Sequence, residues 1–162
     1  MINRLLMAAL VALALPMSAH AQSQSAINAQ KGQDMMQAFT CHHMMRLMFV
    51  DKTKELSQRF YKIGLRLGRD HLEALFAGRI TEEDRRAIIP AVILQVPDDQ
   101  GMNFVLGAMY QLSKEVAFKK IEEQLGGDFY DFRKSQRNRV INNLFDAQIF
   151  QAPTCDGILR AN

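Results

Sequence analysis

The fold is decided by one segment, MMQAFTCHHMMRLMF at residues 35–49, which holds five methionines, two histidines and one of the two cysteines of the chain. With about 100° between successive residues of a helix, the cysteine and three of the methionines fall on one arc, whereas apolar and histidine side chains fall on another. The first arc comprises Cys41, Met44, Met45 and Met48. A helix that is apolar nearly all round is packed on several sides. The segment therefore predicts a central helix, which we expect over about residues 27–50.

The start of the chain has the features of an export signal. Arg4 supplies a single positive charge, an apolar run follows from Leu5 to Leu15, and a small-x-small cleavage site is present at Ala19–Ala21. The apolar run is too short for a membrane-spanning helix. We therefore expect residues 1–21 to be a cleavable signal peptide and the protein to be periplasmic. No later segment of the sequence predicts a transmembrane helix.

The formal net charge of +3 is small for a chain of 162 residues. It is too slight to indicate nucleic-acid binding. One basic run, RKSQRNR at residues 133–139, could contact an anionic surface such as lipopolysaccharide or peptidoglycan. A solvated helix face explains the same run more simply. The length of the chain is enough for one domain with its own core.

The two cysteines, Cys41 and Cys155, are expected to form a disulfide, because the compartment that receives exported proteins is oxidising. A bridge that closes so long a loop restricts the unfolded chain and contributes roughly 5 kcal/mol in the chain-entropy model. It would hold the C-terminal tail, residues 151–162, against the first helix. The alternative is two free thiols, one of them available to a metal ion.

The spacing of apolar residues predicts four more helices after the first one. Capping and breaking residues set their limits. Thr53 and Gly78 bound the second helix at about residues 54–77, and Thr81 caps the third. A break at residues 97–99 precedes the fourth helix, which ends at about residue 125. Asp128 caps the fifth helix, which reaches about residue 150. Residues 22–26 have nothing to bury and predict a flexible segment.

Pro90 must kink or split the third helix, because proline cannot continue a helical hydrogen-bond ladder. The β-branched run that follows it predicts either more helix or a short strand. Since the rest of the chain has helical spacing and short connections, the sequence predicts an all-α fold. We expect an irregular four- to five-helix bundle over residues 27–150, with one long-range disulfide that ties the C-terminal tail to the first helix.

Two glycines predict a close contact between helices. Gly64 and Gly68 stand four residues apart on or near the buried side of the second helix. Because glycine has no Cβ, a neighbouring helix can approach its backbone closely. We expect a helix crossing at this point, and we expect Gly107 of the fourth helix to meet the same patch.

The sequence has no set of residues that predicts catalysis. His71 lies on the apolar side of the second helix, where a hydrogen-bonded core residue is the simpler interpretation. No paired-cysteine spacing, zinc helix, phosphate loop or nucleophile elbow is present. The acidic residues cluster at helix starts, where capping and the helix dipole explain them. We therefore expect neither an enzyme nor a bound cofactor.

One alternative gives the first helix a chemical role. Thioether ligands select Cu(I), and the candidate ligands are His42, Met44, Met45 and Met48. Against this hypothesis, His42 and His43 point about 100° apart on a helix, and a disulfide would remove Cys41 as a ligand. Methionine is also a common filler of helical cores.

By elimination, the leading hypothesis is a small exported helical protein that acts by contact with another envelope protein, as an inhibitor, an immunity protein or an envelope accessory or chaperone protein does. The second hypothesis is a periplasmic Cu(I)-binding protein that uses the methionine-rich helix. The first requires an exposed apolar or charged patch. The second requires sulfur ligands that a metal ion can reach.

Overall fold

The computed structural model describes residues 23–48, 52–88, 101–146 and 155–162, and the account below concerns these residues. They form six α-helices and one short 3-10 helix, without a strand among the described residues. The elements are α1 (Gln24–Leu47), α2 (Lys52–Phe76), α3 (Glu82–Ile88), α4 (Met102–Leu125), η2 (Phe129–Asp131), α5 (Lys134–Asp146) and α6 (Cys155–Ala161). The predicted all-α fold is confirmed.

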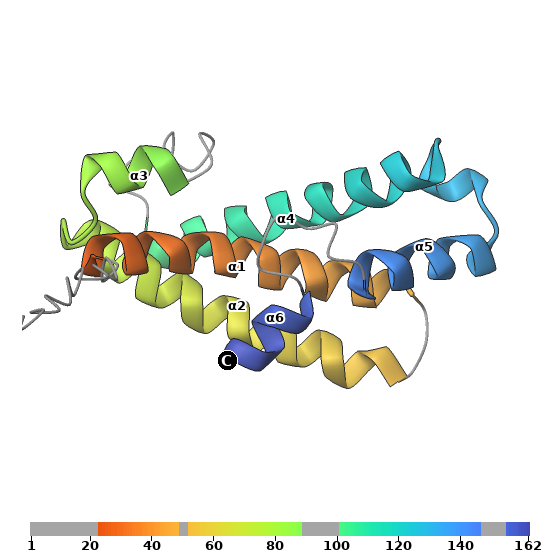
Figure 1. Ribbon diagram of the computed structural model, residues 1–162, viewed down its shortest axis with the longest axis horizontal. Coiled ribbons are helices and arrows are strands. Elements are labelled where there is room, and N and C mark those ends of the chain that lie inside the picture. The colour runs from red at the N-terminus through yellow and green to blue at the C-terminus, as the bar shows by residue number, and fades with distance from the viewer. Residues whose placement is uncertain (1–22, 49–51, 89–100, 147–154) are drawn as a thin grey trace, which may run out of the picture.

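The methionine-rich helix α1 is the centre of the bundle. It contacts each of the five other α-helices, and Figure 1 shows it between α2 and α4, which run along it on opposite sides. Twelve of its residues are buried, from Asn28 to Met45. An all-round apolar helix therefore occupies the position that its sequence predicted.

The predicted bridge between Cys41 and Cys155 is present, with 5.8 Å between the two Cα atoms. Both cysteines are fully buried. Within the segment expected as a tail, residues 155–161 are helical: Cys155 begins α6, and Ile158 is only 1% exposed in the core. The disulfide thus joins two helices, and not a helix and an irregular tail.

The first arc, formed by Cys41, Met44, Met45 and Met48, is called the sulfur arc below. It lies in the larger of the two main cores. Met44, Met45 and Met48 are 0%, 3% and 6% exposed. They belong to a cluster whose other large members come from α2, α4, η2, α5 and α6: Phe60, Ile121, Phe129, Ile141, Leu144 and Ile158. The second core joins the middle of α1 to α2 and α4 through Met35, Phe39, Leu67, Leu72, Val105, Leu106 and Met109.

The prediction that residues 22–26 are flexible is wrong from Ser23 onward, because α1 begins at Gln24. The Ser23 side chain caps the helix by accepting a hydrogen bond of 3.0 Å from the Ala26 amide. Ser25 then accepts 2.7 Å from the Thr81 amide and donates to Asp84 at the start of α3. The composition of residues 22–26 gave no sign of these contacts, because Thr81 and Asp84 lie far away in the sequence.

Two of the predicted helix limits at α2 and α3 are confirmed, and one is wrong. Gly78 ends α2 with φ of +65°, and the next amide, that of Arg79, donates 2.8 Å to the Ala74 carbonyl. Thr81 caps α3 by accepting from the Asp84 amide. Thr53 is not an N-cap, because α2 already begins at Lys52 and the Thr53 hydroxyl donates 3.1 Å to the Met45 carbonyl.

The last predicted helix begins later than expected. Gly126, at φ of +76°, ends α4 as predicted. Asp128 caps only the 3-10 helix η2, by accepting 2.8 Å from the Tyr130 amide, and α5 begins at Lys134. The short turn places Phe129 in the core at 1% exposure, which a continuous helix pattern did not indicate. The predictions for Pro90, for the run after it and for residues 147–150 lie outside the described residues.

Gly64 and Gly68 occupy close helix contacts, whereas the prediction for Gly107 is wrong. A Cβ at Gly64 would stand 2.5 Å from the Phe39 ring, and one at Gly68 would stand 2.4 Å from Leu106. Gly107 is exposed, with nothing within 4 Å of a Cβ placed there. Apolar residues surround much of α4, so their spacing did not show which side faces α1 and α2.

Candidate functional site

Two histidines of α1 lie where α1 faces both α2 and α4. His42 Nδ1 is 2.9 Å from the Ser57 carbonyl oxygen, and His42 Nε2 is 2.9 Å from the Tyr110 hydroxyl. A carbonyl only accepts, so Nδ1–H donates to Ser57 and Nε2 accepts from the Tyr110 O–H. Burial lowers the pKa of His42, the hydrogen bond to Ser57 raises it, and the charge of Arg46 lowers it. His42 is therefore a neutral, fixed imidazole near pH 7.

His43 holds the backbone of the same tyrosine. Its Nε2 lies 3.1 Å from the Tyr110 carbonyl oxygen and donates to it. Burial, together with the smaller electrostatic effects of His42, Arg46 and Lys114, lowers the pKa of His43 to about 4, although the hydrogen bond to Tyr110 raises it. A base of this pKa is far from the range in which a histidine exchanges protons efficiently at neutral pH.

Tyr110 is thus held by its hydroxyl and by its carbonyl, and aromatic rings surround it. Its ring centre is 4.4 Å from that of His43, 5.3 Å from that of Phe39 and 5.6 Å from that of Tyr61. The Phe39 contact is edge-to-face, an arrangement that aromatic pairs favour. The tyrosine is a rigid point on the surface of the bundle.

Two cavities meet at Tyr110. The first, of about 290 Å³, lies between α2 and α4 and is lined by Tyr61, Leu65, Arg69, Asn103, Leu106, Gly107 and Tyr110. The second, of about 390 Å³, lies between α1, α4 and η2 and is lined by His43, Arg46, Leu47, Tyr110, Gln111, Lys114, Phe118 and Tyr130. We call the two cavities together the Tyr110 groove.

As far as the described residues line it, the Tyr110 groove has cations and aromatic rings in its wall but no carboxylate. Arg69 lines the first cavity, and Arg46 and Lys114 line the second. Among the described residues, none of these three cations forms an ion pair. Tyr130, at the edge of the second cavity, is 75% exposed. The groove therefore suits a ligand that is anionic and also has a flat apolar part.

The structure buries all four predicted copper ligands, His42, Met44, Met45 and Met48. The methionines of the sulfur arc are buried in the core, whereas both ring nitrogens of His42 are engaged by Ser57 and Tyr110. Cys41 is bonded to Cys155. Within the described residues, no group of three or more His, Cys, Asp or Glu side chains could hold a metal ion. The sulfur arc packs against apolar side chains, which is the role of a core filler.

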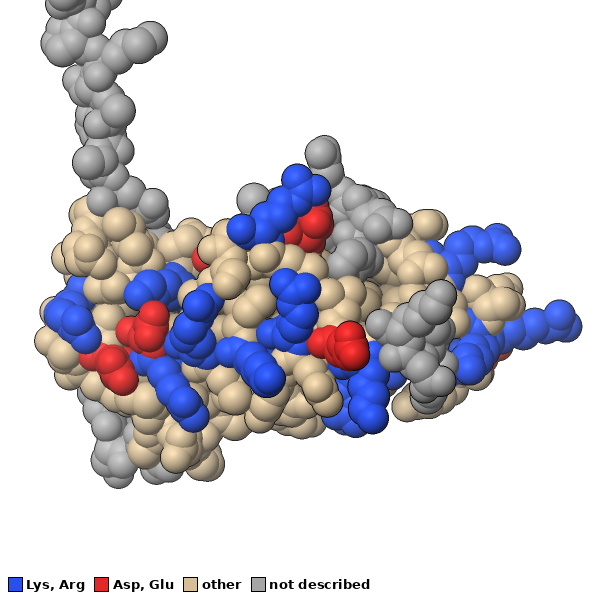
Figure 2. All heavy atoms as spheres, turned by 90° about the horizontal axis from the view of Figure 1, so that it is seen from below, with Lys and Arg blue, Asp and Glu red and all other residues tan. Residues whose placement is uncertain are grey.

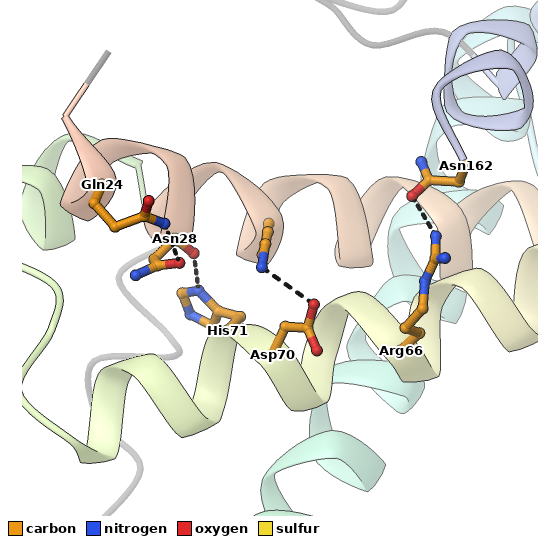
Figure 3. A network of polar contacts seen from close by, with 7 residues as sticks. Gln24, Asn28, Arg66, Asp70, His71 and Asn162 are labelled. Atoms are coloured by element: carbon orange, nitrogen blue, oxygen red, sulfur yellow. Dashed lines mark hydrogen bonds and ion pairs between the residues drawn. The ribbon is translucent and has the colours of Figure 1, made fainter. Parts of the chain in front are cut away.

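His71 is a core histidine, as predicted. It is fully buried, and its Nδ1–H donates 2.8 Å to the Asn28 carbonyl of α1 (Figure 3). Its Nε2 is buried and has no hydrogen-bond partner among the described residues, and burial lowers its pKa. Gly32 makes room for the ring, because a Cβ there would stand 2.7 Å from His71 Cε1. The same edge of the α1–α2 contact carries the Lys31–Asp70 ion pair at 3.1 Å.

Comparison with protein-family models, with curated proteins and with solved structures finds no match to this chain. No helix of the described residues is sufficiently long and apolar to cross a membrane.

The sequence contained part of the signal for the groove. Phe39, His42, His43 and Arg46 have helical spacing and form a second face of α1, beside the sulfur arc. The partner residues Tyr61 and Tyr110 belong to two other helices and were not singled out. Only the packing of α2 and α4 on α1 brings these residues to one place.

Proposed function

We propose that this chain is an exported, periplasmic protein that acts by binding another envelope protein, without catalysis. The Tyr110 groove receives a segment of that partner that carries carboxylates next to an aromatic or large apolar side chain. The observation that carries this proposal is the lining of the groove, in which the described residues supply three cations, four aromatic side chains including Tyr61 and Tyr130, and no carboxylate.

The chemistry of the groove favours binding over catalysis. In the part of the chain that the structure describes, neither cavity is lined by a serine, cysteine, aspartate or glutamate that could act as a nucleophile or a paired acid. His43 is a weak base, with a pKa of about 4, and its Nε2 is already committed to Tyr110. Arginine and tyrosine, in contrast, are the residue types most often found at the energetic centres of protein interfaces.

The test is site-specific photocrosslinking in the bacterial periplasm. A photoreactive phenylalanine analogue replaces Gln111, which lines the second cavity, or Gln124, which is exposed near the C-terminal end of the same helix. We expect one dominant adduct from position 111 and none from position 124. Mass spectrometry of the adduct should place the crosslink in a segment rich in Asp or Glu. Equal adducts from both positions, or a crosslinked segment that is basic, would contradict the proposal.

A further inference from the structure

The outer side of α2 carries a row of four cations, of which only Arg69 belongs to the Tyr110 groove. Arg59, Lys62, Arg66 and Arg69 are spaced by three, four and three residues, so they share one helix face. All four are exposed, and the face lies opposite the buried side of the helix. We call these four residues the α2 stripe. Over ten residues it extends for about 15 Å.

No carboxylate neutralises the α2 stripe within the described residues. None of its four cations forms an ion pair, and Arg66 donates to the neutral amide oxygen of Asn162 at 2.6 Å (Figure 3). Two nearby acids are engaged elsewhere: Asp70 with Lys31, and Asp156 with Arg160. Figure 2 shows many basic and few acidic side chains on the side of the bundle where Figure 1 places α2 and α6.

The two unpaired acids of this face lie at its ends. Glu55 and Glu73 each stand four residues beyond the outermost cations, and both are exposed. Between Glu55 and Glu73, the four cations of the α2 stripe therefore follow one another without an acidic residue among them. Such a segment presents its charges in a line that one flat anionic surface can contact at once.

We infer that the α2 stripe binds the phosphate headgroups of an anionic phospholipid membrane. The stripe lies on the side of the helix turned away from the core, and a convex row of charges fits a plane better than it fits an extended peptide. Three of its four residues are arginines, whose planar guanidinium can bind two oxygens of one phosphate. The inference goes beyond the proposed function, because it concerns a second surface and a second class of partner.

The two surfaces meet at Arg69, which lines the first cavity of the Tyr110 groove and also ends the α2 stripe. Binding through the stripe would hold the bundle with α2 toward the membrane and leave the second cavity, which no α2 residue lines, open to a partner. Arg69 is left unchanged in the test so that the groove stays intact.

The test uses protein purified from the periplasm with its disulfide intact. Sedimentation with vesicles of equal parts phosphatidylglycerol and phosphatidylcholine, in 50 mM NaCl, measures the affinity. Each basic residue near an anionic surface contributes about fivefold, so the triple variant R59Q/K62Q/R66Q should bind on the order of a hundredfold more weakly. Raising the salt to 500 mM should weaken the wild type steeply, because exposed charges are screened.

Two controls separate the stripe from general charge effects. The variant R133Q/K134Q/R139Q removes the same formal charge from exposed positions before and within α5, and it should keep most of the affinity. The variant N162A removes the Arg66 contact with the residue that follows α6 and should also bind normally. Circular dichroism checks that the triple variant is folded; if it is not, the single variants R59Q and K62Q are measured in its place, with about a fivefold loss expected for each.

Three results would overturn the inference. Equal binding to pure phosphatidylcholine vesicles would show that headgroup charge is not recognised. An equal loss in the α5 control would show that only net charge matters. Competition by polyglutamate that displaces the vesicles at equal charge concentration would indicate an acidic polypeptide as the partner of the stripe. The groove variants R46Q and K114Q should leave vesicle binding unchanged, so failure of this inference and failure of the proposed function are distinguishable.

Discussion

The hydroxyl of Tyr110 donates to Nε2 of His42 across 2.9 Å, and this bond connects the exposed groove to the centre of the bundle. His42 is only 7% exposed and its other nitrogen is bonded to the Ser57 carbonyl of α2. One tyrosine of α4 is therefore linked through one histidine of α1 to the backbone of α2. The rigidity of the groove follows from the same contacts that hold three helices together.

Replacing Tyr110 by Phe should destabilise the protein by about 1–3 kcal/mol, because Nε2 of His42 would remain buried without its donor. The matched control is Tyr61→Phe, since Tyr61 contacts the same rings but is 39% exposed. We expect a loss below about 0.5 kcal/mol for the control. Urea unfolding of both variants measures the difference. Equal losses of stability in the two variants would show that the Tyr110–His42 hydrogen bond contributes no more than the exposed hydroxyl of Tyr61 does.

Stability should fall as the pH is lowered from about 6.5 to about 4. Burial lowers the pKa of His42, His43 and His71 below the ordinary value of 6.5, to about 4 for His43. The unfolded chain then binds more protons than the folded one in this window, so the free energy of unfolding decreases with decreasing pH. Urea midpoints at several pH values give the slope.

The variant H43Q tests the assignment of this pH dependence. Glutamine can still donate to the Tyr110 carbonyl but does not titrate, so the slope between pH 6.5 and 4 should become shallower. An unchanged slope in H43Q would mean that His43 does not take part in the pH dependence.

Alanine should destabilise the protein at Gly64 and Gly68 but stabilise it at Gly107. At Gly64 and Gly68 the new Cβ would stand 2.5 Å and 2.4 Å from Phe39 and Leu106, and we expect losses of about 1–3 kcal/mol from overpacking. At Gly107 nothing lies within 4 Å, so alanine should stabilise the exposed helix by about 0.5–1 kcal/mol. Thermal unfolding of the three single variants decides this. Stabilisation at Gly64 or Gly68 would refute the close contact.

Two substitutions of Met45 separate a packing role of the sulfur arc from a metal-binding role. Met45→Ala should cost about 2–5 kcal/mol because it leaves a cavity, whereas Met45→Leu conserves volume and should cost less than about 1.5 kcal/mol. Titration with Cu(I) against a competing chelator should show no difference between the wild type and Met45→Leu. Stoichiometric Cu(I) binding that the leucine variant abolishes would restore the metal hypothesis.

The sequence carried the information for those parts of the fold that depend on local chemistry or on cysteine pairing. The Cys41–Cys155 bridge, the left-handed glycines Gly78 and Gly126 and the central α1 followed from spacing and composition. The early start of α1 did not, because Ser25 is held by Thr81 and Asp84, which are distant in the sequence.

The candidate site was less predictable than the fold. His42 and His43 were noticed for their chemistry, but their partners lie on α2 and α4, and no pattern within one helix shows which residues of another helix will face it. The misplacement of Gly107 has the same cause, since α4 is apolar around much of its circumference. Both failures concern contacts between helices. The spacing of apolar residues in one helix does not show which residues of another helix it will contact.

We propose that the Tyr110 groove recognises acidic groups of a partner through Arg46 and Lys114. The most direct measurement is the crosslink yield from the photoreactive residue at position 111 in the double variant R46Q/K114Q, compared with the variant R133Q/R139Q, which removes equal charge outside the groove. We expect the groove variant to lose the adduct by at least about tenfold, as for two charge-assisted contacts, and the other variant to retain it. An undiminished adduct in R46Q/K114Q would contradict the account.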